Sequence, residues 1–181
     1  MQIVIPYAPR PLQQRLHDQL SEKRWGVVVC HRRWGKTVMA INHLLRDAIL
    51  SQKTNPRYSY ISPTYKQSKA VAWDYLKVYA GAIPGAKFHE TELRCDLPNG
   101  ARITLLGSDN VDGLRGIYLD GAVIDEVADI PERLFPEIIR PALSDRAGWC
   151  VFIGTPRGTN AFYDYYEQAV ASDEWVDVVY K

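Results

Sequence analysis

Long hydrophobic runs and an excess of charge of either sign are both missing from this sequence of 181 residues. No apolar stretch approaches the roughly 20 residues that a membrane-spanning helix needs, and residues 1–6 lack the basic and apolar character of a secretory signal. The 22 basic and 21 acidic residues leave a formal net charge of +1. Whole-chain charge therefore favours no class of partner, and any nucleic-acid contact must come from a local patch.

Cysteine is also scarce, with three residues far apart in the sequence. They form no metal-ligand spacing with the four histidines, so we expect buried thiols and neither a disulfide nor a zinc site. The content of 46% hydrophobic and 24% charged residues is typical of a soluble globular protein. At this length the chain fits one domain, and two would be cramped.

The most informative stretch is an apolar strand that runs directly into Gly35, Lys36 and Thr37. Residues 27–37 read VVVCHRRWGKT, and a helical pattern follows. This order is typical of a P-loop, in which backbone amides and a lysine bind phosphates and a hydroxyl binds Mg²⁺. Cys30 replaces the first glycine of the motif, so the match is a variant. A turn that only opens a helix is the alternative interpretation.

A pair of carboxylates ends a later apolar strand, in which residues 122–126 read AVIDE. Beside a P-loop, Asp125 would hold Mg²⁺, mainly through its water shell. Glu126 would orient and deprotonate the attacking water as a general base. Taken alone, the two side chains could simply be solvated.

Several polar side chains could complete a nucleotide site. Phosphoryl transfer spreads negative charge over the γ-phosphate, which the planar guanidinium of Arg32, Arg33 or Arg115 could stabilise. Surface solvation is the alternative for each arginine. Gln13 or Gln14, which precede the first strand, could hydrogen-bond the adenine edge, and the sequence leaves open which one does.

Strand-like and helical segments alternate, which predicts an α/β fold with a mostly parallel sheet and helices on both faces. We expect helices over residues 10–23, 36–51, 65–79, 131–143 and 159–171, and strands over residues 25–30, 58–64, 121–126, 149–156 and 175–180. Ligands bind at the carboxyl edge of such sheets. Cys30, Thr64, Asp125 and Thr155 should all lie there. Near residues 91–106, two alternating segments flank an Asn-Gly pair and predict a β-hairpin insertion.

In the order of these motifs, the chain resembles the large terminase subunits of tailed bacteriophages, the motors that package DNA into capsids. The loop at residues 31–37 is similar to the family's variant phosphate loop, in which arginine replaces small residues. Residues 9–13, PRPLQ, resemble its adenine-recognising glutamine motif. Residues 107–126 resemble its second-motif region, and residues 153–158, IGTPRG, resemble its coupling motif, whose threonine senses the γ-phosphate.

The resemblance implies a P-loop NTPase of the additional-strand, catalytic-glutamate class that hydrolyses ATP with Mg²⁺. The residues implied to contact nucleotide are Gln13, His31, Arg32, Arg33, Trp34, Gly35, Lys36, Thr37 and Thr155, with Thr37 and Asp125 at the metal. Glu126 and Lys36 would be catalytic. Arg32 would act from within the loop, and Arg115 could act on the ATP of a neighbouring subunit.

Double-stranded DNA, a homo-oligomeric ring at the capsid portal and the small terminase subunit are the implied partners, in the host cytoplasm and without a membrane. Large subunits of the family also carry a ribonuclease-H-like nuclease domain after the ATPase domain. No acidic cluster for nuclease metals follows the ATPase motifs in this sequence. We therefore expect a single ATPase domain over residues 1–181 with no nuclease activity.

Two other functions share some of these features. A superfamily-2 helicase or remodelling ATPase has the same Asp-Glu pair, but it needs a second motor domain for which the chain has no room. A non-catalytic module could use ATP only to order an interface. A GTPase is disfavoured because the base-reading Asn-Lys-x-Asp run is missing.

Overall fold

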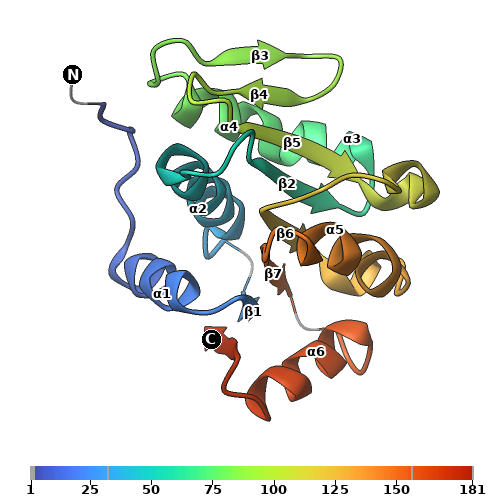
Figure 1. Ribbon diagram of the computed structural model, residues 1–181. Helices are drawn as coiled ribbons and strands as arrows, with labels where there is room; N and C mark the ends of the chain where they lie inside the picture. The colour runs from blue at the N-terminus through green and yellow to red at the C-terminus, as the bar shows by residue number, and fades with distance from the viewer. Residues whose placement is uncertain (1–2, 32, 156, 181) are drawn as a thin grey trace.

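An eight-stranded sheet forms the middle of the computed structural model, which describes residues 3–31, 33–155 and 157–180. The strands are β1 (Trp25–Cys30), β2 (Arg57–Ser62), β3 (Lys87–His89), β4 (Arg94–Asp96), β5 (Arg102–Gly107), β6 (Gly121–Asp125), β7 (Trp149–Gly154) and β8 (Trp175–Tyr180). Their order across the sheet is β3-β4-β5-β2-β6-β7-β1-β8 (Figure 1). In this spatial order, the six strands from β5 through β2, β6, β7 and β1 to β8 are parallel to their neighbours. The strand β4 is antiparallel to both β3 and β5.

The position of β7 confirms the predicted fold class. It lies between β1, which leads into the Gly-Lys-Thr loop, and β6, which ends in Asp125. One additional strand thus separates the P-loop strand from the acidic strand. The hairpin is confirmed as well, because β4 pairs with β5 across the turn at Asn99 and Gly100. The strand β3, which extends this hairpin by one strand, was not predicted from the sequence.

Helices cover both faces of the sheet (Figure 1). The α-helices are α1 (Pro11–Glu22), α2 (Lys36–Leu50), α3 (Tyr65–Ser68), α4 (Asp74–Ala80), α5 (Arg140–Ser144) and α6 (Ala161–Val170). One hydrophobic core packs α1, α2 and α4 against one face, and a second packs α5 and α6 against the other. Adjacent residues of β1 contribute to different cores, because Val27 lies in the second core and Val28 in the first. Burial on both faces explains why the strands read as continuous apolar runs.

Two predicted helices differ from the structure. The helix expected over residues 65–79 contains a π-helical segment, η1 (Lys69–Trp73), between α3 and α4. The helix expected from residue 131 instead starts with a π-helical segment at Phe135, η5 (Phe135–Ile139), and continues as α5. Pro141, within this continuous run, has no amide hydrogen to donate to the preceding turn, which favours irregular hydrogen bonding there. No helix in the described part of the chain is long and apolar enough to cross a membrane.

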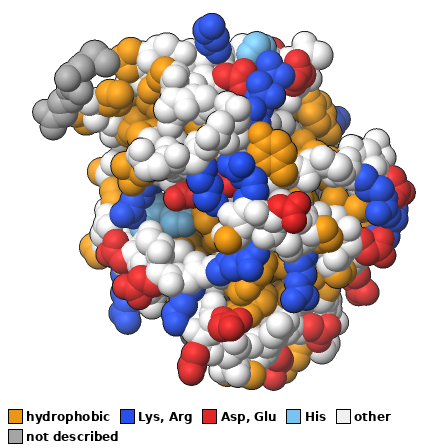
Figure 2. Space-filling model, in the orientation of Figure 1, with side chains coloured by type: hydrophobic (Ala, Val, Ile, Leu, Met, Phe, Trp, Pro, Cys, Tyr) orange, Lys and Arg blue, Asp and Glu red, His pale blue; other side chains and the backbone are white. Residues whose placement is uncertain are grey.

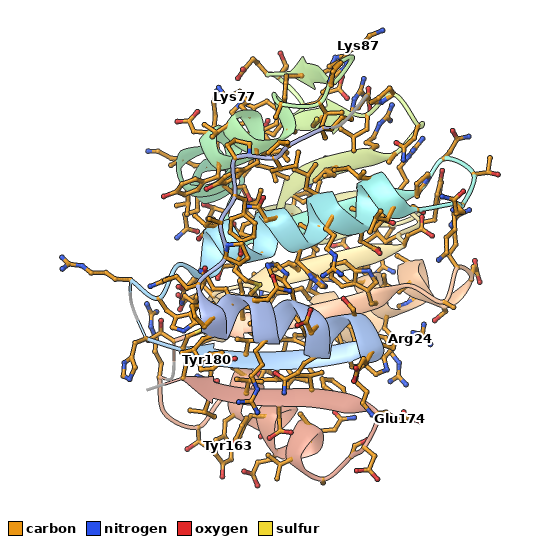
Figure 3. The ribbon with its side chains drawn as sticks, turned by 90° about the vertical axis from the view of Figure 1, so that its left-hand side faces the viewer. Arg24, Lys77, Lys87, Tyr163, Glu174 and Tyr180 are labelled. Carbon is orange, nitrogen blue, oxygen red and sulfur yellow. The ribbon has the colours of Figure 1, made fainter. Side chains whose placement is uncertain are left out.

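At the carboxyl edge of the sheet the chain leaves β1, β2, β6 and β7, and the loops after β1, β6 and β7 carry the predicted motifs. In Figure 3, Arg24 and Glu174 mark the opposite edge, where β1 and β8 begin, and Tyr180 marks the carboxyl edge. Cys30, at this edge, is buried, and so are Cys95 and Cys150, as expected for structural thiols. Figure 2 shows acidic and basic side chains interspersed over one face of the molecule, in keeping with the balanced charge.

A pair of buried histidines joins α1 to α2. His17 Nδ1 lies 3.1 Å from His43 Nδ1, and the hydroxyl of Tyr7 lies 2.9 Å from His17 Nε2. A hydrogen bond between two Nδ1 atoms requires at least one neutral ring, because a protonated imidazole accepts nothing. Burial lowers the pKa of His17 to about 4 and that of His43 to about 3. Folding therefore selects the neutral form of both rings.

The free energy of unfolding should fall as the pH drops from about 6.5 toward 4. In this range the unfolded chain binds protons on both histidines and the folded chain binds far fewer, so the loss should be on the order of 5 kcal/mol. Urea unfolding at stepped pH measures it. His43→Leu should flatten the pH dependence, whereas His89→Gln, at a half-exposed histidine on β3, should leave it steep. An equally steep dependence in His43→Leu would contradict this role.

Candidate active site

The loop between β1 and α2 turns through two left-handed residues, Arg33 at φ 65° and Gly35 at φ 89°. A Cβ atom on Gly35 would lie 2.7 Å from Arg10 Nη2 and 2.9 Å from Gln13 Nε2. The left-handed backbone favours glycine at this position, and the side-chain ends of Arg10 and Gln13 fill the space that a Cβ would occupy. Since Gly35 is the N-cap of α2, the helix begins directly at the turn and directs its first amides toward it.

Three sequence motifs meet at the side chain of Lys36. Its Nζ atom lies 3.1 Å from Glu126 Oε1 and 3.0 Å from Thr155 Oγ1. Glu126 follows β6 and Thr155 follows β7, so the side chains come from the carboxyl ends of neighbouring strands. The Lys36 side chain is 11% exposed and that of Glu126 is 33% exposed. The ion pair is thus shielded from solvent on the lysine side and open on the glutamate side.

Asp125 and Glu126 occupy contrasting environments although they are adjacent. The carboxylate of Asp125 is buried, and burial raises its pKa. Its Oδ1 accepts a hydrogen bond of 2.9 Å from the backbone amide of Glu126, and its Oδ2 accepts one from the hydroxyl of Tyr60. Glu126 adopts a left-handed conformation, φ 49° and ψ 50°. Such conformations are strained for a non-glycine residue and recur at functional sites. This left-handed turn places the Glu126 side chain where it pairs with Lys36.

The residues predicted at a metal fit Mg²⁺ by their chemistry. Thr37 supplies a hydroxyl and Asp125 a carboxylate, the hard oxygen ligands that this cation prefers. Each is adjacent in sequence to one member of the ion pair, since Thr37 follows Lys36 and Asp125 precedes Glu126. Thr37 and Asp125 therefore lie at the same edge of the sheet, at the start of α2 and the end of β6. The Asp125 carboxylate, buried with a raised pKa, is a group whose charge a divalent cation would compensate.

The two glutamines left open by the sequence are clearly separated. Gln13 is buried; its Oε1 accepts from the amide of Arg10 at 3.0 Å, and its Nε2 donates to the carbonyl of Gly35 at 3.4 Å. Gln14 points away, is exposed and bonds Asp18 at 2.9 Å. Of the two, Gln13 is the one that bonds the loop between β1 and α2.

The rest of the loop divides into packed and exposed side chains. Trp34 stacks on Tyr180 with ring centroids 4.9 Å apart, and the guanidinium of Arg10 lies 6.0 Å from the Trp34 ring centroid. Trp34 therefore anchors the loop to β8 and α1. His31 and Arg33 are exposed. Arg32, a predicted catalytic residue, lies outside the described residues.

Arg115 lies in a different environment, in a surface network of charges. Its Nε is 3.2 Å from Asp112 Oδ1 and its Nη2 is 3.5 Å from Glu137 Oε2. Arg133 contacts the same two carboxylates, at 3.0 Å and 4.0 Å. The structure thus brings Gln13, Gly35, Lys36, Thr37, Asp125, Glu126 and Thr155 to one edge, and it pairs Arg115 with surface carboxylates.

The contacts of Tyr60 and Tyr180 were not predicted from the sequence. Tyr60 reads as one more apolar position of a buried strand, and its position next to Asp125 arises only because β2 pairs with β6. Tyr180 meets Trp34 because β8 pairs with β1. A hydroxyl within a fully buried strand is the one feature of the sequence that could have indicated Tyr60, since buried hydroxyls need partners.

Residues 31–179 match the protein family described as the N-terminal part of the T4likevirus-type terminase large subunit. The chain belongs to the terminase large-subunit family. Within it, the terminase large subunit of Thermus virus P23-45 is 26% identical over 90% of this chain. The chain spans 37% of the length of that relative.

Solved structures of terminases share the fold. The large terminase ATPase domain of Thermus phage P74-26 superposes with a TM-score of 0.75 at 26% identity, covering 90% of this chain and 70% of that one. A large terminase from a thermophilic bacteriophage, solved in complex with ADP, gives a TM-score of 0.80 at 18% identity over 94% of this chain and 45% of that one. This terminase chain therefore has the fold of terminase ATPase domains.

Gln13 should stabilise the loop of this terminase chain, whereas Gln14 should not. Gln13→Ala removes a buried amide with two hydrogen bonds and should lower the free energy of unfolding by about 1–3 kcal/mol. Gln14→Ala, one residue away on the exposed side, should change it by less than about 0.5 kcal/mol. Urea unfolding of the two variants beside the wild-type chain measures both. Equal losses would show that the Gly35 contact does not matter.

Proposed function

We propose that this chain is a single ATPase domain that hydrolyses Mg·ATP, and that it powers the translocation of double-stranded DNA within the whole terminase. The observation that carries the proposal is the meeting of Lys36, Glu126 and Thr155 beside the buried carboxylate of Asp125. A phosphate-binding cation, a general base and a hydroxyl at one point are the parts that water attack on a γ-phosphate needs. A fold relative solved with ADP supports nucleotide binding.

Lys36 has two roles in this scheme, because the same ammonium bonds Glu126 and would bind the β- and γ-phosphates. Binding of ATP would draw the ammonium toward the phosphates and leave the Glu126 carboxylate free to accept a proton from water. Thr155 is bonded to the same ammonium at 3.0 Å, so this contact would change when Lys36 moves. The displacement of Thr155 would then be transmitted through β7. The contact between Lys36 and Thr155 would then couple ATP hydrolysis to movement.

Thr37 and Asp125 would hold Mg²⁺, which would neutralise charge on the phosphate oxygens when bound. Gln13 would read the adenine edge beside Gly35. His31, Arg33 and Trp34 would complete the loop around the phosphates, with Arg32 supplying a cis guanidinium. These assignments follow from the resemblance of the motifs, and the contact of Gln13 with the carbonyl of Gly35 supports them.

The proposed partners follow from the packaging role. They are double-stranded DNA, further copies of the chain in a ring at the capsid portal, and the small terminase subunit, in the host cytoplasm. We propose no nuclease activity for the chain, since each motif identified in it serves nucleotide hydrolysis. Arg115 would act on the ATP of a neighbouring copy, which would require it to leave Asp112 and Glu137.

Replacing Glu126 with Gln should separate catalysis from binding. The amide keeps the size of the side chain but cannot accept a proton from water, so ATP hydrolysis should fall by about 10²–10⁴-fold. Binding of a fluorescent ATP analogue should persist. Glu132→Gln, which changes an exposed glutamate six residues away, should leave both unchanged. A chain that binds ATP but hydrolyses none, alone or with DNA, would favour the non-catalytic module.

Arg115 and Arg133 allow a matched test of the inter-subunit role, because both contact Asp112 and Glu137. If Arg115 acts on a neighbouring active site, the ATPase rate per chain should rise with protein concentration and Arg115→Ala should abolish the rise. Arg133→Ala, which disturbs the same charges, should preserve it. A rate per chain that is independent of concentration and insensitive to Arg115→Ala would rule the role out.

A further inference from the structure

Tyr60 is a fully buried polar side chain at the centre of the site. It lies on β2 with 0% of its surface exposed, and its hydroxyl donates a hydrogen bond to Asp125 Oδ2. Asp125 is itself buried, so the hydrogen bond is shielded from solvent at both ends. The hydroxyl therefore lies against the carboxylate that would hold the metal, at the end of β6.

The bond from Tyr60 completes the fixation of the Asp125 carboxylate. Oδ2 accepts from the tyrosine and Oδ1 accepts from the amide of Glu126 at 2.9 Å. A carboxylate held at both oxygens has one orientation, and each oxygen keeps a further lone pair for a metal or its water. Partners of this kind orient ligating carboxylates, and their loss typically weakens metal binding by about 10–100-fold.

We propose that Tyr60 is a positioning residue for the metal centre: its hydroxyl orients the Asp125 carboxylate toward Mg²⁺ and, through Asp125, steadies the left-handed turn at Glu126. The inference rests on the proposed function, because it assumes that Asp125 binds the metal of Mg·ATP. It adds a residue from β2, a strand that carries none of the predicted motifs. Tyr60 itself would touch neither phosphate nor metal.

Tyr58 provides a matched control on the same strand. It lies two residues earlier, on the same face of β2, and it is equally buried at 2% exposed. Its hydroxyl bonds the backbone carbonyl of Asp47 at 3.4 Å, toward the opposite end of α2. Tyr58→Phe and Tyr60→Phe each remove one buried hydroxyl from β2, but only Tyr60→Phe removes it from the site.

The test compares the affinity for a fluorescent ATP analogue in EDTA with that in Mg²⁺. The gain in affinity on adding Mg²⁺ should fall by about 10-fold or more in Tyr60→Phe, with the affinity in EDTA unchanged. Tyr58→Phe should keep the wild-type gain. A role that is only structural would lower the affinity in EDTA or the melting temperature in both variants and leave the gain intact. A wild-type gain in Tyr60→Phe would therefore overturn the proposal.

A second variant shows whether Tyr60 acts through Asp125. Asp125→Asn should remove most of the Mg²⁺ gain, and Tyr60→Phe added to it should cause no further loss, because the oriented carboxylate is already gone. An additive loss would overturn the proposal. A wild-type chain without any Mg²⁺ gain would instead overturn the metal site on which the proposal rests, so the two failures are distinguishable.

Discussion

The ion pair between Lys36 and Glu126 is the interaction on which the arrangement of the site depends. It connects the first residue of α2 with the residue that follows β6, and the same ammonium bonds Thr155 after β7. The segments that follow β1, β6 and β7 are thereby joined at the Nζ atom of Lys36. Because Lys36 is largely shielded from solvent, the pair is stronger than an exposed one and holds Glu126 in a defined place.

Two left-handed residues make this meeting possible. Gly35 turns the chain into α2 while α1 packs tightly against it, and Glu126 turns the chain out of β6. The glycine adopts its conformation at little cost, whereas the glutamate is strained and depends on its surroundings. Asp125 supplies part of that support, since its Oδ1 accepts the amide of Glu126, and Tyr60 in turn holds Asp125. The geometry of the site is thus maintained by a series of polar contacts that starts at the buried hydroxyl of Tyr60.

Most of the fold could be predicted from the sequence, because strands buried on both faces leave apolar runs and the helices between them leave periodic stripes. The hairpin was evident from its Asn-Gly turn. The π-helical segments η1 and η5 were not evident, since they change local hydrogen bonding without altering the hydrophobic pattern. The contact of Gln13, and not Gln14, with the loop before α2 also needed the structure, because it depends on how α1 packs.

By itself the sequence determined which chemical groups are present: a Gly-Lys-Thr turn, an Asp-Glu pair and a Gly-Thr-Pro turn, each at the end of an apolar strand. These are local patterns, and their residue types carry the chemistry wherever they lie. Only the tertiary structure decided which groups meet. The insertion of β7 between β1 and β6 brings Thr155 to Lys36, and the pairing of β2 with β6 places Tyr60 against Asp125. Strand order depends on contacts between distant segments, which no local pattern encodes.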